Sequence, residues 1–408
     1  MKTVRPESVG LSSDALANID RHLLDNYVAP GKIAGCQTAV FRRGELAHHS
    51  VLGVRDIERG TKMTEDTIFR IYSMTKPITS IGLMMLHEEG RFALADPVAR
   101  YIPQFRDLGV YEQGIYPHYV TRPVDSPMTV RDLLSHQSGL TYGFQARTNV
   151  DAGYRKAGIG TKSRSGTLEE MIDELGRLPL EFSPGTAWNY SVATDVCGRL
   201  IEIISGQPLD VFLKERIFEP LGMVDTGFEV PEAELPRLAA NYERRRNKTL
   251  RLVDDPEDSE YRPGVTLFSG GGGLVSTMAD YLRFCRMLLG RGTLDGTRLL
   301  GPKTLELMTQ NHLVGGAYLT EASTGLFGET PYAGTGFGLG FSVILNPVAA
   351  QNVGSVGEYA WGGAASTIFW VDPKEDLSVV FLTQIMPSRT FDFRGQLKSI
   401  IYGALLGD

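Results

Sequence analysis

The sequence feature that most limits the fold is a long apolar segment that begins near residue 73 and ends before Gly90. Its apolar residues, over Ile78–Leu86, recur at helical rather than alternating spacing, which predicts a helix over about residues 73–89. Because apolar side chains occupy most of its circumference, this helix should be buried in the core. Pro77 is compatible with it only in the first turn, where its missing N–H is not needed.

The other segments are strand-like near the chain ends and helical in the middle. Apolar residues at helical spacing predict helices over about residues 14–27, 168–178, 191–205 and 394–406. β-Branched and aromatic runs between turn residues predict strands at 35–41, 46–53, 338–345, 365–371 and 378–383. The segment 228–266 is polar and rich in proline, so we expect an exposed excursion there.

This order of segments predicts an α+β fold with two domains. We expect one mainly antiparallel sheet flanked by helices and built from both termini, plus a helical domain. At 408 residues the chain exceeds the usual size of a single core. The sheet domain should comprise residues 1–72 and 290–408, the helical domain residues 73–289, and the site should lie between them.

The composition argues against several classes of function. With a net charge of −7 and no long basic run, the chain should bind neither nucleic acid nor an anionic membrane surface. No apolar stretch resembles a signal peptide or a membrane span, so we expect a cytoplasmic location. Cys36, Cys197 and Cys285 are far apart in apolar surroundings, which indicates reduced core residues. We expect no metal ion and no cofactor, and the sequence does not indicate an oligomeric state.

Ser73 and Lys76 stand at the start of the predicted buried helix. Unpaired backbone N–H groups and the positive end of the helix dipole favour developing negative charge there. Lys76 lies one turn further on the same face, so its amine can reach the Ser73 oxygen. Ser-x-x-Lys alone is a weak pattern, which more often marks an N-cap serine and a solvated surface lysine than a catalytic pair. The apolar helix behind it favours a desolvated lysine, and hence a nucleophile paired with a base.

A lysine base needs help from its surroundings. A free lysine has a pKa of about 10.4, so action as a base near neutral pH requires a depression of about three units, by burial or a nearby positive dipole. Tyr190 follows a Pro-Gly turn at the start of a predicted helix, which suits its phenol to share the proton. The alternative for Tyr190 is a buried structural tyrosine.

The third candidate segment is Trp361–Gly362–Gly363–Ala364, in which two glycines open a strand. Glycines there let a substrate approach the backbone closely, and the Ala364 N–H can pair with the Ser73 N–H as an oxyanion hole. The alternative is a bulge at the start of the strand.

Together these motifs resemble the serine β-lactamase and penicillin-binding-protein superfamily, most closely its class C-like branch with the family VIII carboxylesterases. Ser73–Lys76 matches the first motif of the family, Tyr190 begins the second, and Trp361–Gly363 occupies the place of the third, Lys-Thr-Gly. Three further segments are similar to recurring family segments, so the resemblance covers nearly the whole chain: Leu94–Pro97, His136–Gly139 and Gly271–Leu274.

Departures from the family pattern bear on the substrate. Trp361 stands where β-lactamases carry the lysine of Lys-Thr-Gly, and Val192 stands where they usually carry asparagine. Both changes remove groups that recognise an anionic, amide-bearing ligand, so neutral esters fit better. The resemblance therefore implies a carboxylesterase for short-chain acyl esters, with a Ser73 acyl-enzyme, Lys76 and Tyr190 as base, and weak β-lactam hydrolysis.

The resemblance also implies a set of substrate contacts: Trp361, Gly362, Gly363, Tyr142, Phe144, His136 and Gln137. The alternatives are a β-lactamase or an acyltransferase of the same superfamily, and a binding homologue that has lost the reaction. An α/β-hydrolase would need Gly-x-Ser-x-Gly, which the chain lacks. His87–Arg91 lacks the second histidine of a zinc-protease motif.

Overall fold

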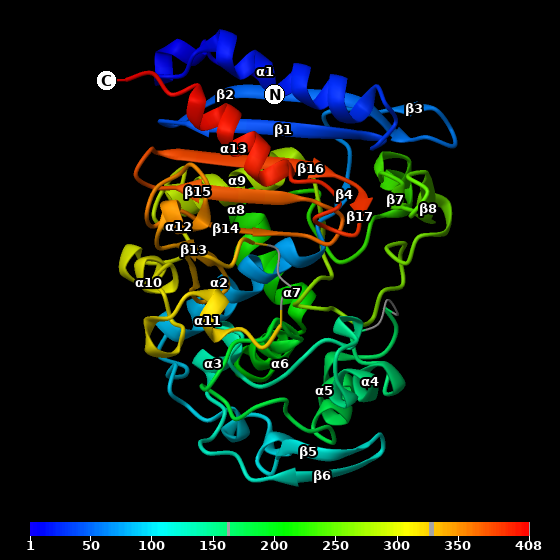
Figure 1. The fold of residues 1–408 in the computed structure, drawn as a ribbon, viewed down its shortest axis with the longest axis vertical. Coiled ribbons are helices and arrows are strands. Elements are labelled where there is room, and N and C mark those ends of the chain that lie inside the picture. The colour runs from blue at the N-terminus through cyan, green and yellow to red at the C-terminus, as the bar shows by residue number, and fades with distance from the viewer. Residues whose placement is uncertain (161–163, 326–329, 408) are drawn as a thin grey trace.

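The centre of the fold is an eight-stranded sheet in which the two ends of the chain meet (Figure 1). The computed structural model describes residues 1–160, 164–325 and 330–407. In spatial order the strands are β12 (Thr335–Phe337), β13 (Ser342–Ile344), β14 (Tyr359–Gly362), β15 (Ile368–Asp372), β16 (Leu377–Thr383), β1 (Gly35–Arg42), β2 (Glu45–Asp56) and β3 (Thr61–Lys62). Neighbouring strands are antiparallel throughout. The predicted α+β fold, with one sheet built from both termini, is confirmed.

β1 and β16 form the seam at which the two chain ends join. Their pairing runs from Cys36 opposite Thr383 to Arg42 opposite Leu377, and β2 pairs with the other edge of β1. All residues of β1 are buried. Because successive side chains of a strand point to opposite faces, β1 contributes to two core layers, with Cys36 in one and Ala39 in the other.

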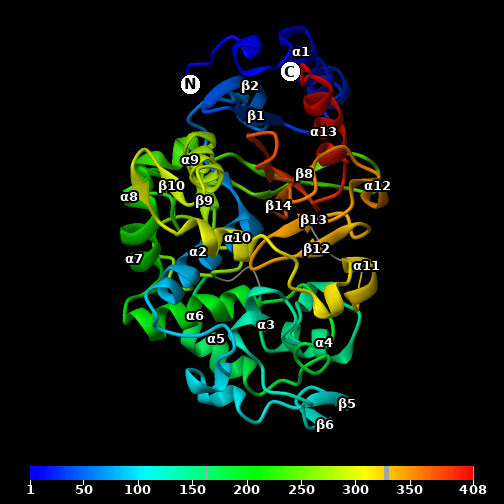
Figure 2. The same cartoon turned by 90° about the vertical axis from the view of Figure 1, so that its left-hand side faces the viewer.

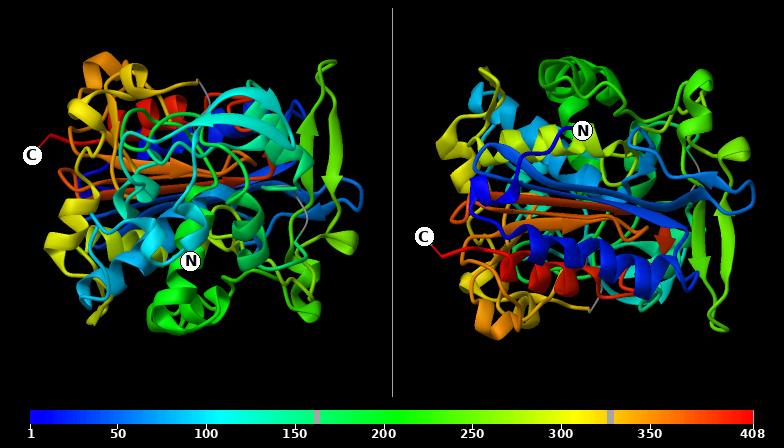
Figure 3. Two further views of the ribbon diagram at one scale, coloured as in Figure 1. Left: turned by 90° about the horizontal axis from the view of Figure 1, so that it is seen from below. Right: turned by 90° about the horizontal axis from the view of Figure 1, so that it is seen from above.

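Different helices cover the two faces of this sheet. α1 (Ser13–Leu23) and α13 (Phe393–Gly403) lie together on one face, where Leu16 and Leu397 are buried (Figure 3). α9 (Met278–Leu289) packs against β1, β15 and β16 on the other face (Figure 2). The helices predicted near the two termini are therefore confirmed.

The helical region lies below the sheet in Figure 1 and is organised around α2 and α6. α2 (Thr75–Glu88) is buried without interruption from Thr75 to Leu86, as its apolar sequence predicts, and Pro77 lies in its first turn. α6 (Ala193–Ser205) packs against α2 and three further helices: α3 (Val130–Leu134), α5 (Leu168–Leu175) and α7 (Leu209–Leu213). Burial of α2 on all sides fixes the position of its first residues.

The remaining elements are short. The other helices are α4 (Asn149–Lys156), α8 (Glu219–Leu221), α10 (Pro302–Met308), α11 (Leu319–Ala322) and α12 (Pro347–Ala350). The other strands pair as β4 (Phe69–Arg70) with β9 (Val275–Ser276), β5 (Val110–Ile115) with β6 (His118–Arg122), β10 (Thr293–Leu294) with β11 (Thr297–Arg298), and β7 (Asn241–Arg244) with both β8 (Leu250–Asp254) and β17 (Ile385–Met386).

Two predictions from the sequence are wrong. Residues 338–345 do not form one strand, because β12 and β13 flank a turn in which Gly340 has a φ of +94°. Residues 228–266 are not an exposed excursion, because β7 pairs with β17 from the C-terminal segment. Tyr242 and Tyr261 are accordingly buried.

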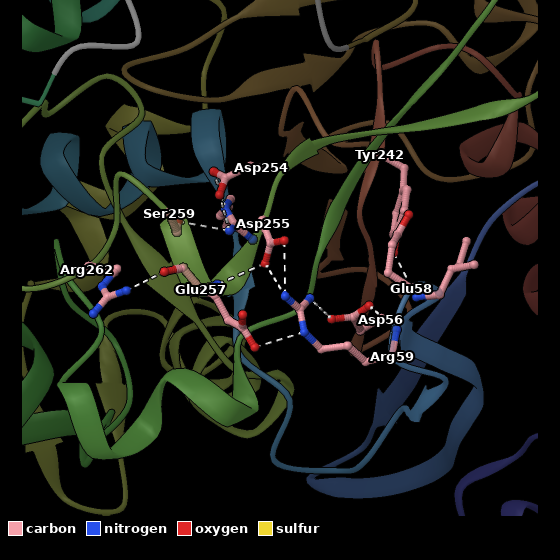
Figure 4. Close-up of polar contacts among 11 residues, drawn as sticks. Asp56, Glu58, Arg59, Tyr242, Asp254, Asp255, Glu257, Ser259 and Arg262 are labelled. Atoms are coloured by element: carbon pink, nitrogen blue, oxygen red, sulfur yellow. Dashed lines mark hydrogen bonds and ion pairs between the residues drawn. The ribbon is translucent and has the colours of Figure 1, made fainter.

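Ion pairs fix the segment around β7 and β8 to the rest of the molecule. Arg59, in the turn between β2 and β3, contacts three carboxylates (Figure 4): Asp56, Asp255 and Glu257. Deeper in the molecule, Arg70 is fully buried and donates to Asp254 from Nε at 2.7 Å and from Nη2 at 2.5 Å. Since a buried guanidinium is costly without a paired charge, this contact holds the segment against the strand that leads to Ser73.

The described residues offer no helix long and apolar enough to cross a bilayer. Within the same residues, no three His, Cys, Asp or Glu side chains are grouped to hold a metal ion. Cys36, Cys197 and Cys285 are buried and free of disulfides, as expected. The domain boundaries given above stay a prediction.

Candidate active site

Ser73 lies at the junction of the sheet and the helical region. β4 leads into a short 3₁₀ turn, Tyr72–Met74, and α2 follows directly. Tyr72 has a φ of +42°, a conformation that costs about 1–3 kcal/mol in a residue other than glycine. The Met74 carbonyl accepts a hydrogen bond from Tyr281 Oη at 3.0 Å and so holds the turn. The Ser73 hydroxyl is thereby presented at the start of α2, partly open to solvent.

Lys76 lies one helical turn after Ser73 and is 1% exposed. Its Nζ donates to Gly271 O at 2.6 Å, Tyr142 Oη at 3.0 Å and Ser73 Oγ at 3.3 Å. It also lies 4.6 Å from the centroid of the Tyr190 ring. An ammonium group has three hydrogens to donate, so oxygen atoms on three sides favour the charged form.

Tyr190 approaches Ser73 from the helical region. Its Oη donates to Ser73 Oγ at 2.6 Å, and the residue is 1% exposed. α6 begins three residues later at Ala193, so the phenol lies near a helix N-terminus, as the sequence predicts. The structure thus brings the three residues assigned to catalysis, Ser73, Lys76 and Tyr190, around one oxygen atom.

The end of β14 runs beside the turn that carries Ser73. A Cβ on Gly363 would lie 2.3 Å from Ile71 O and 2.4 Å from Thr367 Oγ1. The close approach that this glycine permits is therefore to the protein's own backbone. Among the residues that the structure describes, none accepts a hydrogen bond from the N–H of Ser73 or Ala364. Such N–H groups on adjacent segments are what an oxyanion hole requires.

Three of the predicted substrate contacts are buried in the wall behind the site. The rings of Trp361 and His136 pack against Tyr190, with centroids 5.5 and 5.1 Å away. Gln137 is buried as well, and its side chain donates to Ser135 Oγ at 2.8 Å. The ring contacts of Trp361 and His136 fix the orientation of the Tyr190 ring, while contact of the three residues with a substrate stays a prediction.

Tyr142 and Phe144 continue the wall towards the solvent. Their rings stack with centroids 4.6 Å apart, and Phe144 is 52% exposed. The sequence suggests only a pocket-lining role for Tyr142, and its hydroxyl contact with Lys76 Nζ was not foreseen. Phe144 is the member of the predicted set that lies at the surface.

Burial determines which groups around Lys76 carry charge. Desolvation lowers the pKa of His136 well below its usual value, and the positive charge of Lys76 lowers it further, so His136 is neutral. Desolvation raises the pKa of Tyr142 well above its usual value, and the Asp195 charge adds to this, so its phenol is neutral as well. Neither group changes charge near neutral pH.

Asp195 belongs to the site although sequence reasoning missed it. This buried residue lies in the first turn of α6, and its Oδ1 accepts from Ser269 Oγ at 2.5 Å and from the Gly271 N–H at 3.0 Å. A Cβ at position 271 would lie 2.5 Å from Asp195 Oδ2. The glycine at position 271 therefore serves close packing against Asp195.

The geometry suits nucleophilic attack by Ser73 on a carbonyl carbon. A phenol and an amine within reach of its hydroxyl can remove and return a proton. Backbone N–H groups at the helix start and beside β14 can hold an oxyanion. The arrangement therefore has the parts of an acyl-transfer site.

Comparison with known proteins agrees with this geometry. The chain matches the Beta-lactamase family model over residues 21–399. Protein Rv1367c of Mycobacterium tuberculosis is 36% identical over 365 residues, which cover 89% of this chain and 88% of the relative. Esterase EstB of Burkholderia gladioli is 31% identical over 396 residues, which cover 93% of each protein.

A solved structure extends the comparison to the fold. EstCE1, described as a hydrolase with promiscuous acyltransferase activity, is 26% identical and gives a TM-score of 0.79 over 98% of this chain and 99% of that chain. The sheet and its helices have the expected β-lactamase and penicillin-binding-protein-like fold. Since both the sequence match and the fold extend over most of its length, the chain belongs to the beta-lactamase family.

Proposed function

We propose that this protein is a carboxylesterase that hydrolyses short-chain acyl esters through an acyl-enzyme on Ser73, and that it falls among the family VIII carboxylesterases of the class C-like branch. The chain is a serine hydrolase of the beta-lactamase family. One observation carries the proposal: Ser73 Oγ lies 2.6 Å from Tyr190 Oη and 3.3 Å from Lys76 Nζ. The name of EstB supports an ester substrate.

Acylation starts once the Lys76 and Tyr190 pair, which acts as the base, has lost one proton, with Lys76 as an ammonium and Tyr190 as a phenolate. The Ser73 hydroxyl gives its proton to the Tyr190 oxygen while Ser73 Oγ attacks the ester carbonyl carbon. The carbonyl oxygen takes up the negative charge and accepts from the N–H groups of Ser73 and Ala364. When the C–O bond to the alcohol breaks, Tyr190 returns the proton to the departing oxygen.

Deacylation repeats these steps with water in place of serine. Tyr190 takes a proton from the water molecule as the water oxygen attacks the acyl carbon. The bond between that carbon and Ser73 Oγ then breaks, and the proton passes back to Ser73. The carboxylic acid is released, and the charges on Lys76 and Tyr190 are restored.

Two buried apolar residues support a neutral substrate. Trp361 and Val192 are both fully buried and stand where β-lactamases carry polar groups for the antibiotic. A ligand that relied on those groups would leave its own carboxylate and amide unpaired here, whereas a simple ester would lose nothing. The preference for short acyl chains remains part of the proposal, as do a small-molecule ester as the binding partner and a cytoplasmic location.

The replacement Ser73→Ala tests the proposal. It should abolish hydrolysis of p-nitrophenyl butyrate while the protein still folds, with stability lowered by about 1 kcal/mol for the lost hydrogen bond to Tyr190. Ser80→Ala is the matched control, because Ser80 lies on the same helix and is buried, and its hydroxyl has no hydrogen-bond partner among the described residues. Activity retained in the Ser73 variant would remove that residue from the mechanism.

A panel of substrates separates the related activities. Esters of graded acyl length should be hydrolysed faster than nitrocefin, and nitrocefin turnover above every ester would identify a β-lactamase. EstCE1 is described as having promiscuous acyltransferase activity, so added alcohols should be included as acceptors. More ester exchange than hydrolysis would identify an acyltransferase. Failure of a fluorophosphonate to label Ser73 would identify a binding homologue.

A further inference from the structure

We propose that Asp195 is a positioning residue whose carboxylate, acting through Gly271, keeps Lys76 in its ammonium form beside Ser73 and Tyr190. The inference rests on the proposed function, because it assigns the proton-carrying role to Tyr190 and a charge-bearing role to Lys76. Asp195 acts through the loop over residues 269–271 and has no part in the proposed bond changes.

Asp195 links the start of α6 to the loop that binds Lys76. The residue is 4% exposed, and its Oδ1 accepts from the Ser269 hydroxyl at 2.5 Å and from the Gly271 N–H at 3.0 Å. The Gly271 carbonyl accepts from Lys76 Nζ at 2.6 Å, a shorter contact than those of Nζ with Ser73 and Tyr142. One carboxylate oxygen therefore fixes the residue that holds the amine.

A capping role does not account for these contacts. In α3, α4 and α5 the third residue closes a capping box with the preceding threonine. In α6 the N-cap is Val192, which makes no side-chain cap, and its N–H donates to Thr141 O at 3.2 Å. The carboxylate at the third position of α6 therefore binds a different segment of the chain.

The charges of the groups around Lys76 and Asp195 also support this role for Asp195. The titratable groups that face Lys76 and Asp195 come from several elements: His136, Tyr142, Tyr190 and Cys197. Desolvation keeps His136, Tyr142 and Cys197 neutral, since it lowers the pKa of the first and raises the pKa of the other two. Desolvation raises the pKa of Asp195 above its usual value, although the Ser269 hydroxyl, the Lys76 charge and the Gly271 N–H act in the opposite direction. The two hydrogen bonds and the facing cation all stabilise the carboxylate form, so we assign a negative charge to Asp195.

This charge sets the acid side of the activity profile. The resting pair of Lys76 and Tyr190 carries one positive charge when both are protonated, and it must lose one proton before Tyr190 can act as a base. A nearby negative charge stabilises the fully protonated pair and so raises the pH at which that proton leaves. Removal of the charge on Asp195 must therefore move the acid limb of the pH–activity profile, the range in which activity is lost on acidification, to lower pH.

The test is the pH profile of kcat/KM for p-nitrophenyl butyrate in Asp195→Asn. This change keeps an oxygen able to accept from Ser269 and Gly271 but removes the charge. The acid limb should move down by about one pH unit. The rate at which a fluorophosphonate labels Ser73 should show the same shift, and this readout needs no natural substrate.

Asp280→Asn is the matched control. Asp280 occupies the same position in α9 as Asp195 in α6 and is 3% exposed. It likewise accepts from a hydroxyl, Thr226 Oγ1 at 2.9 Å, and from a backbone N–H, that of Asp225 at 2.7 Å. Its variant should keep the wild-type acid limb, because none of these contacts involves the site.

The outcomes separate this inference from the proposed function. An unmoved acid limb in Asp195→Asn, or an equal shift in Asp280→Asn, overturns the inference while ester hydrolysis stands. If Asp195→Asn does not fold, Ser269→Ala takes its place. That variant should lower kcat more than threefold with KM unchanged, and wild-type kcat would overturn the inference. Wild-type protein that neither hydrolyses esters nor becomes labelled at Ser73 refutes the proposed function itself.

Discussion

Tyr190→Phe should separate chemistry from packing at the site. The change removes one hydroxyl, which donates to Ser73 Oγ at 2.6 Å, and leaves the ring between Trp361 and Tyr142. Loss of one hydrogen bond to a partly exposed hydroxyl should cost about 1 kcal/mol of stability. Loss of the proton carrier should lower kcat/KM about 100- to 10,000-fold, which corresponds to about 3–5 kcal/mol of transition-state stabilisation.

The assay is hydrolysis of p-nitrophenyl butyrate, with urea unfolding measured on the same samples. Tyr154→Phe is the control, since Tyr154 is also fully buried but lies in α4, away from Ser73. It should leave kcat/KM within about threefold of wild type, because the Tyr154 hydroxyl takes no part in the proposed proton transfers. A similar small effect in Tyr190→Phe would refute the assignment of Tyr190 as the proton carrier.

Three further predictions concern the surroundings of the site. Gly363→Ala places a Cβ 2.3 Å from Ile71 O, so the turn before Ser73 must shift and kcat/KM should fall by about 100-fold or more; a fall below tenfold would contradict this. Asp254→Ala leaves the buried Arg70 without its ion pair and should destabilise the fold by about 3–5 kcal/mol in urea unfolding, and a loss of less than about 1 kcal/mol would show that the pair is dispensable. Burial raises the pKa of Glu181 from 4.5 to about 7, so the stability that its protonated form contributes is present below pH 4.5 and is lost as the pH rises through about 7. Glu181→Gln should therefore unfold at higher urea than wild type at pH 8 but not at pH 4.5, and equal midpoints at both pH values would contradict the shift.

Much of the fold could be predicted because its core elements have strong local patterns. The apolar run over Ile78–Leu86 is too long and too regular for anything but a buried helix, and the strands near both ends left one sheet as the simple solution. The prediction of one strand over residues 338–345 is wrong because this segment contains a turn as well as β-branched residues. Gly338 at that turn packs against a carbonyl from α10, where a Cβ would lie 2.1 Å from Met308 O, and the local sequence does not show such a contact.

The site, like the fold, was predicted only in part. The motif spacing was sufficient to select Ser73, Lys76 and Tyr190, which the structure places around one oxygen. Asp195 was missed because an acidic residue in the first turn of a helix is ordinarily a cap. The sequence does hold one signal, the apolar residue Val192 at the N-cap position. Because valine has no side-chain group that can form a capping box, the Asp195 carboxylate lacks the N-cap partner that it would usually have.

The seam between β1 and β16 has a consequence for biosynthesis. During translation the hairpin of β1 and β2 leaves the ribosome long before β16, the strand that pairs with the other edge of β1. Until then, one edge of β1 exposes unsatisfied peptide groups that invite pairing with other nascent chains. The β1–β2 hairpin therefore depends on a segment made much later to protect its edge, and a chain truncated before β16 should aggregate rather than fold as a smaller product.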